Sequence, residues 1–409
     1  MDSDVRSRRT QDRRSKPRVL VVTPSLRGGS WVSLRQLMEE TWGTTAYTVV
    51  GLGLGGRLPR HIAGVLALPY LSYEVVGGRI AGHSILSALY ETPLLALATL
   101  VTLAVRPRVI IGNGIVATAG CLLAAKLVGA RIVLSYHGTV EGYVTPRFGR
   151  LSKRLLRSVD LFLANSQGSA EDLSRVSDPR KILVVMHWVE DFFFDPPPRL
   201  EARQRLGVDG GFVLGFVGRI DREKHSDVLL EAARRMQDPE ARFLFAGRGE
   251  LEREVEEAAR QDSRIRWLGY VEDRSRIRDL YAACDLVWTH AEETYLARPA
   301  VEALACGTPI VLPDVPAVTE RARAGVRIRR EMIPPGVSFL VRPDAEVLSA
   351  LLARLSADPG ELARLRPLCR EYALKHHSRA AVVPAVLEAY GRVVSGARSE
   401  SPPRGGPDG

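Results

Sequence analysis

The feature that most constrains the fold is a regular alternation of short, β-branched apolar runs with segments of helical periodicity. Such alternation is typical of a parallel sheet flanked by helices. In the first half of the chain the runs lie at 19–23, 48–51, 109–112, 132–136, 161–164 and 182–186. In the second half they lie at 212–217, 242–246, 265–268, 286–289, 309–312 and 338–341. Each set suits one doubly wound domain, so we predict an α/β protein with two Rossmann-like domains.

A proline-rich segment at 191–198 separates the two sets of runs. Three consecutive prolines end it and stiffen the chain, so we predict an interdomain hinge there. The predicted domains are residues 17–195 and 196–379, because 409 residues exceed one ordinary core. Ligands bind beyond the carboxyl ends of strands in such sheets, so we expect a site in a cleft where both domains present those ends.

Charge and cysteine usage narrow the class of protein. The composition, 45% hydrophobic and 25% charged, is that of a soluble globular protein, and the four cysteines form no CxxC pair. This argues against a zinc site or a disulfide framework and suits a reducing cytoplasm. Residues 1–16 hold six basic and three acidic residues and contribute part of the net charge of +10. They are predicted to be a disordered basic arm, and residues 397–409 are predicted to be a disordered tail.

The basic arm raises the question of partners. It has no apolar core segment and is therefore no signal peptide, but it could touch anionic lipid at the inner face of the cell membrane. Nucleic acid is disfavoured, because no recognition motif or aromatic platform accompanies the arm. Residues 84–105 are nearly long enough to span a bilayer, yet they contain Glu91 and Pro93 and lead directly into a strand. A buried helix is the better interpretation, and surface association stays open.

Cations follow the first strand of the second set. Gly218 and Arg219 end the run at 212–217, and Lys224 precedes a helical pattern. A strand-to-helix turn already favours an anion, and an arginine fork with a lysine charge would bind two phosphates. The same cations would stabilise charge on a departing diphosphate.

The strings at 215–220 and 223–224, with the Glu-Ala-Leu-Ala-Cys-Gly-Thr-Pro string at 302–309, resemble the C-terminal domain of the family 4 glycosyltransferases. The resemblance implies the GT-B fold, with helix 380–396 crossing back to the first domain. It implies transfer of a sugar, with retention, from a UDP- or GDP-linked donor to a glycan or lipid-linked acceptor.

The resemblance also implies roles for single residues. Arg219 and Lys224 would be catalytic, and Glu302 would bind the ribose hydroxyls as the second Glu of an E-x7-E motif. His137, just past a strand, would face the donor sugar and position it. The loop with Gly28 and Gly29 would approach the donor phosphate and the acceptor.

The first Glu of the E-x7-E motif is where the sequence departs from the pattern. Thr294 stands eight positions before Glu302, with Glu293 beside it, and Tyr295-Leu296 replaces the usual glycines. Either Thr294 fills this place as a neutral group or a longer loop brings Glu293 to it. Both alternatives put these residues, with Tyr295 and Leu296, against the donor sugar.

The pocket for the nucleobase is expected beyond the ends of two predicted strands, one followed by Gly247 and the other by Tyr270. Tyr270 or Val271 would contact the ring, in a position similar to that in the family. The only Asp-x-Asp string lies in the basic arm, so we expect no metal and no cofactor.

Two rivals belong to other classes. One is a GT-B-shaped nucleotide-binding or scaffold protein without transfer activity, favoured by Thr294. The other is a nucleotide-sugar epimerase of the same fold.

Overall fold

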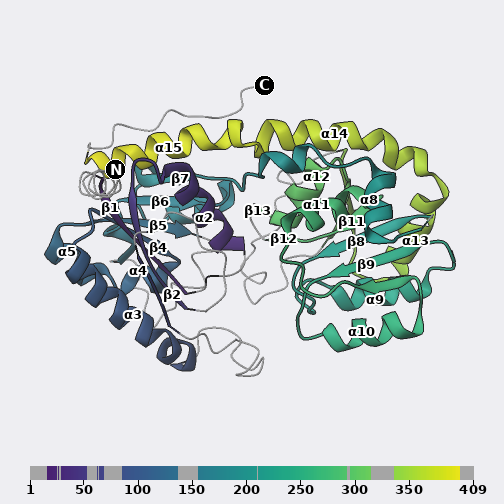
Figure 1. Ribbon diagram of the computed structural model, residues 1–409, viewed down its shortest axis with the longest axis horizontal. Coiled ribbons are helices and arrows are strands. Elements are labelled where there is room, and N and C mark those ends of the chain that lie inside the picture. Colours follow the sequence, from purple (N-terminus) through teal and green to yellow (C-terminus); the bar gives the residue numbers. More distant parts are fainter. Residues whose placement is uncertain are drawn as a thin grey trace, which may run out of the picture. The chain divides into compact units, whose positions relative to one another are not determined.

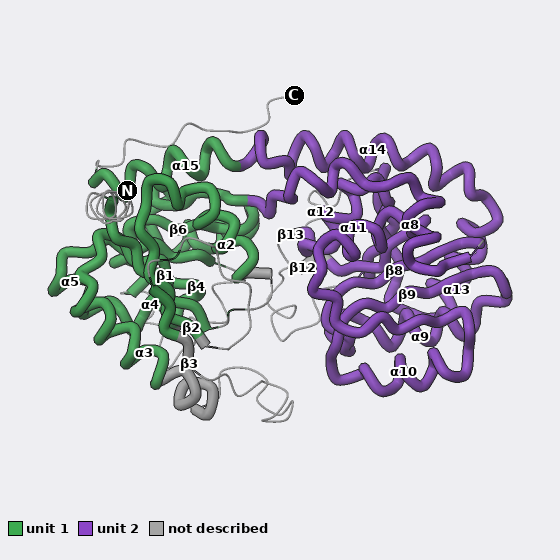
Figure 2. The backbone as a smooth tube through the Cα atoms, viewed as in Figure 1, with its two compact units in different colours: residues 1–185, 383–409 green, residues 186–382 purple. Residues whose placement is uncertain are grey.

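The computed structural model describes residues 16–24, 26, 29–52, 62, 64–68, 85–136, 155–209, 211–292, 295–314 and 336–396. The chain forms two compact units (Figure 2). Unit 1 comprises residues 1–185 and 383–409, and unit 2 comprises residues 186–382. The predicted arm and tail lie outside the described residues, except for Lys16.

Unit 1 is built on a 7-stranded sheet with the order β3-β2-β1-β4-β5-β6-β7. Every neighbouring pair is parallel. The strands are β1 (Arg18–Thr23), β2 (Ala46–Leu52), β3 (Gly64–Leu68), β4 (Val109–Asn113), β5 (Arg131–Tyr136), β6 (Leu161–Ala164) and β7 (Ile182–Val184). Central strand β4 is buried at every position, which explains its apolar Val-Ile-Ile run. The buried amide of Asn113 at its end donates to the Thr23 hydroxyl at 3.0 Å.

Helices pack around this sheet (Figure 1). They are α2 (Gly29–Thr41), α3 (Ile85–Val105), α4 (Ile115–Ala119), α5 (Leu122–Val128), α7 (Gln167–Ser174) and the short η2 (Pro179–Lys181). Gly120, just before α5, brings α5 against α3, because a Cβ there would lie 2.7 Å from the Leu95 side chain. The Thr99 hydroxyl of α3 donates to the Gly120 carbonyl at 2.7 Å and fixes this packing.

Unit 2 is built on a 6-stranded parallel sheet with the order β10-β9-β8-β11-β14-β15. The strands are β8 (Val213–Val217), β9 (Arg242–Ala246), β10 (Ile265–Trp267), β11 (Leu286–Trp288), β14 (Ile310–Pro313) and β15 (Ser338–Val341). A separate antiparallel pair joins β12 (Ala291–Glu292) to β13 (Tyr295–Leu296). The helices are η3 (Asp191–Phe194), α8 (Arg199–Leu206), α9 (Ser226–Arg235), α10 (Glu252–Gln261), α11 (Arg274–Ala283), α12 (Arg298–Ala305), α13 (Ala345–Ala357) and α14 (Pro359–His377).

The core of unit 2 consists of two apolar clusters. Val213 of β8 belongs to one cluster, while Leu214 and Phe216 belong to the other. Successive side chains of a strand point to opposite faces, so the two clusters cover the two faces of the sheet. This is the doubly wound arrangement that the sequence predicts.

All the predicted strands are present, and the two-domain α/β prediction is confirmed. Strand β3 was not predicted, because its sequence Gly-Val-Leu-Ala-Leu has weak β-propensity and it pairs only with β2. The hairpin of β12 and β13 is too short to leave a periodic signal.

The hinge prediction at 191–198 needs correction. The units divide between Val185 and Met186, so that segment belongs wholly to unit 2. Phe193 and Phe194 are buried in the same apolar cluster as Val189. Burial of this aromatic area anchors the segment, despite the stiff prolines that follow.

The C-terminal helix α15 (Arg379–Ser395) returns to the first domain, as predicted, since its residues from Val383 onward belong to unit 1. The Tyr47 hydroxyl of β2 donates to the Tyr390 hydroxyl of α15 at 2.8 Å in a buried contact. Arg108 and Arg131 donate to the last carbonyls of this helical stretch. These cations satisfy helix-end carbonyls and complement the helix dipole.

Candidate functional site

The loops that follow β8, β9 and β10 are joined by backbone hydrogen bonds at the carboxyl edge of the unit 2 sheet. The bonds run from Gly218 N to Ala246 O (3.0 Å), from Ile220 N to Arg248 O (2.9 Å) and from Gly247 N to Gly269 O (2.8 Å). The sequence-predicted phosphate loop and base loops therefore lie next to one another within unit 2.

Gly247 permits this close approach. Its φ is +149°, and a Cβ there would lie 1.8 Å from the Gly218 carbonyl oxygen. A carbonyl oxygen cannot yield to a side chain at this distance without main-chain movement. Glycine at 247 is thus a requirement of loop packing, whatever ligand the loops bind.

Arg219 leaves β8 beside two carboxylates. Its Nε donates to Asp221 and its terminal nitrogen to Glu223, while 54% of the side chain remains exposed. Partial burial lowers the pKa of Arg219, but the two carboxylates raise the pKa more, and the net shift is upward. The guanidinium is therefore a permanent cation with an exposed face.

Lys224 contacts the second oxygen of the Glu223 carboxylate, whose first oxygen contacts Arg219. Its Nζ lies 3.2 Å from Glu223, and its backbone N–H donates to Asp221 at 2.9 Å. The Lys224 carbonyl accepts from the Trp288 indole at 3.1 Å, which fixes the loop to β11. Glu223 consequently bridges Arg219 and Lys224, and being 65% exposed it can be displaced toward solvent.

The residue after Lys224 has an unusual backbone. His225 has φ +53°, in the left-handed region that non-glycine residues rarely occupy. Burial lowers the pKa of the His225 imidazole, and the nearby His290 and Lys224 lower it further. Such conformations cluster at ligand-binding sites.

Glu302 of α12 is buried, with only 2% of its side chain exposed. One oxygen lies 2.7 Å from the Arg274 guanidinium and 4.0 Å from the Arg298 guanidinium. The other oxygen accepts from the Tyr281 hydroxyl at 3.3 Å. Glu302, which is predicted to bind the ribose hydroxyls, thus lies in a buried ion-pair network.

Arg274 connects this network to the start of unit 2. It also pairs with Glu190 at 3.0 Å, and its guanidinium lies 4.7 Å from the centre of the Phe193 ring. Burial lowers the pKa of Arg274, but Glu302 and Glu190 raise the pKa more strongly, and the net shift is upward. For Glu190, burial raises the carboxyl pKa, while Arg274 and Arg298 lower it to a net value below normal.

The residues predicted to contact the nucleobase and the donor sugar differ in their solvent exposure. Tyr270 is 61% exposed beyond β10, and Val271 packs partly against the core of unit 2. Tyr295 and Leu296 form β13. The Leu296 side chain is only 6% exposed and belongs to the apolar cluster, so it serves packing.

Several predicted site residues lie outside the described residues. They are Gly28, His137, Glu293 and Thr294. Gly29 is described as the first residue of α2. The choice between Glu293 and Thr294 therefore stays a prediction.

Sequence reasoning missed the partners of the predicted residues. Arg274 and Arg298 lie against Glu302, and Glu190 pairs with Arg274. Asp221 and Glu223 hold Arg219. Asp221 and Glu223 stand between the two predicted cations, so their spacing was an available signal. The Glu190–Arg274 contact joins distant segments, and no local pattern announces it.

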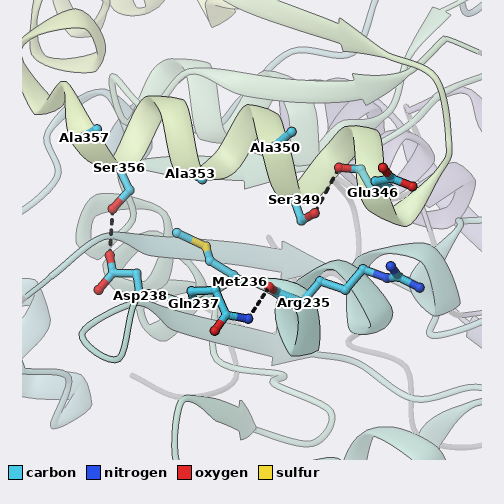
Figure 3. Close-up of a pocket in the computed structure, with 10 residues that line it drawn as sticks. All are labelled: Arg235, Met236, Gln237, Asp238, Glu346, Ser349, Ala350, Ala353, Ser356 and Ala357. Carbon is cyan, nitrogen blue, oxygen red and sulfur yellow. Dashed lines mark hydrogen bonds between the residues drawn. The ribbon is translucent and has the colours of Figure 1, made fainter.

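A separate hollow of about 560 Å³ lies between the end of α9 and α13 (Figure 3). Ser356 donates to Asp238 across it at 2.7 Å, and Ala350 and Ala353 line the helix side. Its lining comes from residues 235–238 and from α13, and it does not include Arg219 or Lys224. Among the described residues, no group of three or more His, Cys, Asp or Glu side chains is arranged to hold a metal ion.

Two family models match the chain. Residues 28–191 match Glycosyltransferase Family 4, and residues 211–358 match Glycosyl transferases group 1. The chain thus contains a Glycosyltransferase Family 4 domain followed by a Glycosyl transferases group 1 domain, and it has the two Rossmann-like domains of the GT-B fold.

The relatives are consistent with this family. The D-inositol 3-phosphate glycosyltransferase of Geodermatophilus obscurus is 34% identical over 42% of each chain. That of Mycolicibacterium vanbaalenii is 29% identical over 60% of this chain and 56% of its own. The chain spans about half the length of these curated relatives.

Solved structures share the whole fold. Anabaena HepE in complex with UDP-glucose has a TM-score of 0.70 at 20% identity, covering 92% of this chain and 99% of its own. Sucrose-phosphate synthase from Thermosynechococcus elongatus has a TM-score of 0.70 at 18% identity, covering 93% and 100%.

Proposed function

We propose that this protein transfers a sugar from a nucleoside-diphosphate sugar to an acceptor hydroxyl, with retention of configuration and without a metal ion. The observation that carries the proposal is the pair formed by Arg219 and Lys224 at the end of β8. One carboxylate, Glu223, contacts both cations, so their charges already converge on a single anionic group. A diphosphate that displaced Glu223 would offer each cation its own phosphate.

The cations have a further role in the proposed chemistry. As the bond between the sugar and the diphosphate breaks, negative charge grows on the leaving phosphate, and Arg219 and Lys224 stabilise it. That phosphate oxygen then accepts the acceptor's proton, and the acceptor attacks from the face that the diphosphate leaves. His137 positions the donor sugar, and the glycine loop at 28–29 approaches the phosphate.

Glu302 is proposed to accept hydrogen bonds from the ribose hydroxyls. The contact with Arg274 at 2.7 Å fixes the direction of the Glu302 carboxylate, which suits recognition of a diol. The base would bind beside Gly247 and Tyr270, at the joined loops. Because HepE was solved with UDP-glucose, a uridine donor is the first to test.

The acceptor is the less constrained substrate. The named relatives are D-inositol 3-phosphate glycosyltransferases, so that polyol phosphate heads the acceptor panel, before glycans and lipid-linked acceptors. The four cysteines are buried thiols, which supports a cytoplasmic enzyme.

The first experiment is a thermal shift with UDP, GDP, ADP and their common sugars. Wild type should be stabilised by several degrees by one diphosphate, and Arg219→Ala/Lys224→Ala should lose this shift. The matched control is Arg222→Ala, because Arg222 lies in the same loop but is 71% exposed and pairs with Asp227. No shift with any nucleotide at millimolar concentration would refute the donor site.

Transfer assays then separate the rivals. A scaffold protein would bind the diphosphate without transferring sugar, and an epimerase would isomerise the donor in the absence of acceptor. Activity that EDTA abolished and Mg²⁺ restored would contradict the metal-independent mechanism.

A further inference from the structure

Helices α3 and α5 lie side by side on unit 1 (Figure 1). Both helices carry large apolar side chains that are exposed. On α3, Leu100 is 64% exposed and Leu103 is 41% exposed. On α5, Leu123 and Leu127 are each 71% exposed. We call these four leucines, with the helix surface between them, the α3–α5 face.

The outer side of α3 is apolar throughout its described part. Its exposed positions from 93 to 105 are Pro93, Ala96, Leu100, Leu103 and Ala104. The opposite side of the helix already packs in the core through Leu94 and Ala98, which are fully buried. Core packing therefore explains one side only, whereas surface helices of globular proteins normally carry polar residues on the other.

Cations border the α3–α5 face. Lys126 is exposed between the two leucines of α5, and Arg106 and Arg108 are exposed where the chain leaves α3. Arg131 follows α5 at the start of β5. One acid, Asp160, is exposed at this edge of the sheet, where it accepts from the Ile132 N–H.

We propose that the α3–α5 face docks on the surface of an anionic bilayer. The leucines enter the boundary between headgroups and acyl chains, and Lys126 and Arg106 contact lipid phosphates. Within the described residues no helix is long and apolar enough to cross a membrane, so the contact is an interfacial one. This inference is independent of the proposed donor chemistry.

The cations that border the α3–α5 face favour an anionic bilayer over a second copy of the chain as its partner. A two-fold interface would place the same patch against itself, so that the cations bordering one copy would face the cations bordering the other. Like charges facing each other oppose such an interface, whereas anionic lipid attracts them. The leucines then supply apolar area and the cations supply charge complementarity.

Cosedimentation with vesicles tests the proposal. Full-length protein should bind vesicles of mixed phosphatidylglycerol and phosphatidylcholine. It should not bind vesicles made only of phosphatidylcholine. Leu100→Ser/Leu123→Ser should lower binding by about tenfold or more, since apolar area drives insertion. The matched control is Leu368→Ser/Leu374→Ser, because these α14 leucines are each 48% exposed but lie in unit 2.

A labelling experiment covers the case in which the double variant fails to fold. The four native cysteines are buried, so Leu127→Cys provides an accessible thiol for an environment-sensitive fluorophore. Its emission should rise and shift to the blue on mixed vesicles, while the same label at Leu368→Cys should stay unchanged.

Three results would overturn the proposal. The first is that wild type does not bind the mixed vesicles. The second is that Leu100→Ser/Leu123→Ser, with the basic arm intact, binds these vesicles as tightly as wild type. The third is that the fluorophore at position 127 does not respond to the vesicles. A dimer in light scattering that Leu100→Ser/Leu123→Ser converts to monomer would assign the face to a second copy instead.

Discussion

Replacing Arg274 with methionine tests the buried network around Glu302. Arg274→Met keeps much of the side-chain volume but removes the cation that contacts Glu302 at 2.7 Å and Glu190 at 3.0 Å. Glu302 is 2% exposed, so its carboxylate cannot recover hydration. Arg298, at 4.0 Å, and the Tyr281 hydroxyl remain as partial compensation.

The magnitude follows from the cost of an unpaired buried charge. Removing one partner of a buried pair costs about 3 to 5 kcal/mol, and the remaining neighbours place this case near the lower end, at about 3 kcal/mol. For a domain of the size of unit 2, this corresponds to a fall in Tm of roughly 6 to 12 °C. Part of the loss should return in Arg274→Met/Glu302→Gln, because that variant removes the stranded charge.

Differential scanning calorimetry of wild type, Arg274→Met, Glu302→Gln and the double variant measures these differences in stability. The control is Arg278→Met on the same helix, whose guanidinium pairs with the adjacent Asp279 at 3.2 Å and which should cost less than Arg274→Met. A loss below about 1 kcal/mol in Arg274→Met would refute the argument from an unpaired buried charge. So would a double variant as unstable as the sum of the two single variants.

Three further predictions concern the loops, the buried histidine and the cation pair. Gly247→Ala should cost about 2 kcal/mol or more in urea unfolding, because its Cβ would meet the Gly218 carbonyl, whereas Gly391→Ala, with nothing within 4 Å, should cost nothing. Burial lowers the pKa of His377 to about 4 from 6.5, so the neutral form is favoured in the folded state. Stability should then fall by up to about 3 kcal/mol as pH drops from about 6.5 toward 4, and His377→Gln should flatten that pH profile in chemical unfolding. Glu223→Gln should tighten UDP binding in calorimetric titration by roughly threefold to tenfold, since it removes the carboxylate that bridges both cations; weaker binding would contradict that competition.

Most of the fold was predictable because its signals are local. The strand β4 begins with a Val-Ile-Ile run, and glycine and arginine directly follow β8, so each element could be predicted from a few neighbouring residues. The same reasoning failed at the hinge, where Phe193 and Phe194 outweigh the prolines by packing against residues distant in sequence. It failed at β3 for a similar reason, since that strand exists through its pairing with β2.

The candidate site divides in the same manner. Arg219 and Lys224 were identifiable because a strand-to-helix turn with two cations is a local motif with its own chemistry. Their shared contact with Glu223, and the network of Glu302 with Arg274, depend on side-chain directions and on chain segments brought together by folding.

Local sequence signals were therefore sufficient to predict the two doubly wound domains, the order of their strands along the chain and the cations that follow β8. The boundary between the units, the need for glycine at 247 and the buried, paired state of Glu302 emerged only from the folded chain. The physical reason is that apolar periodicity and turn chemistry act over a few residues. Burial and ion pairing depend on neighbours that the chain acquires only when it folds.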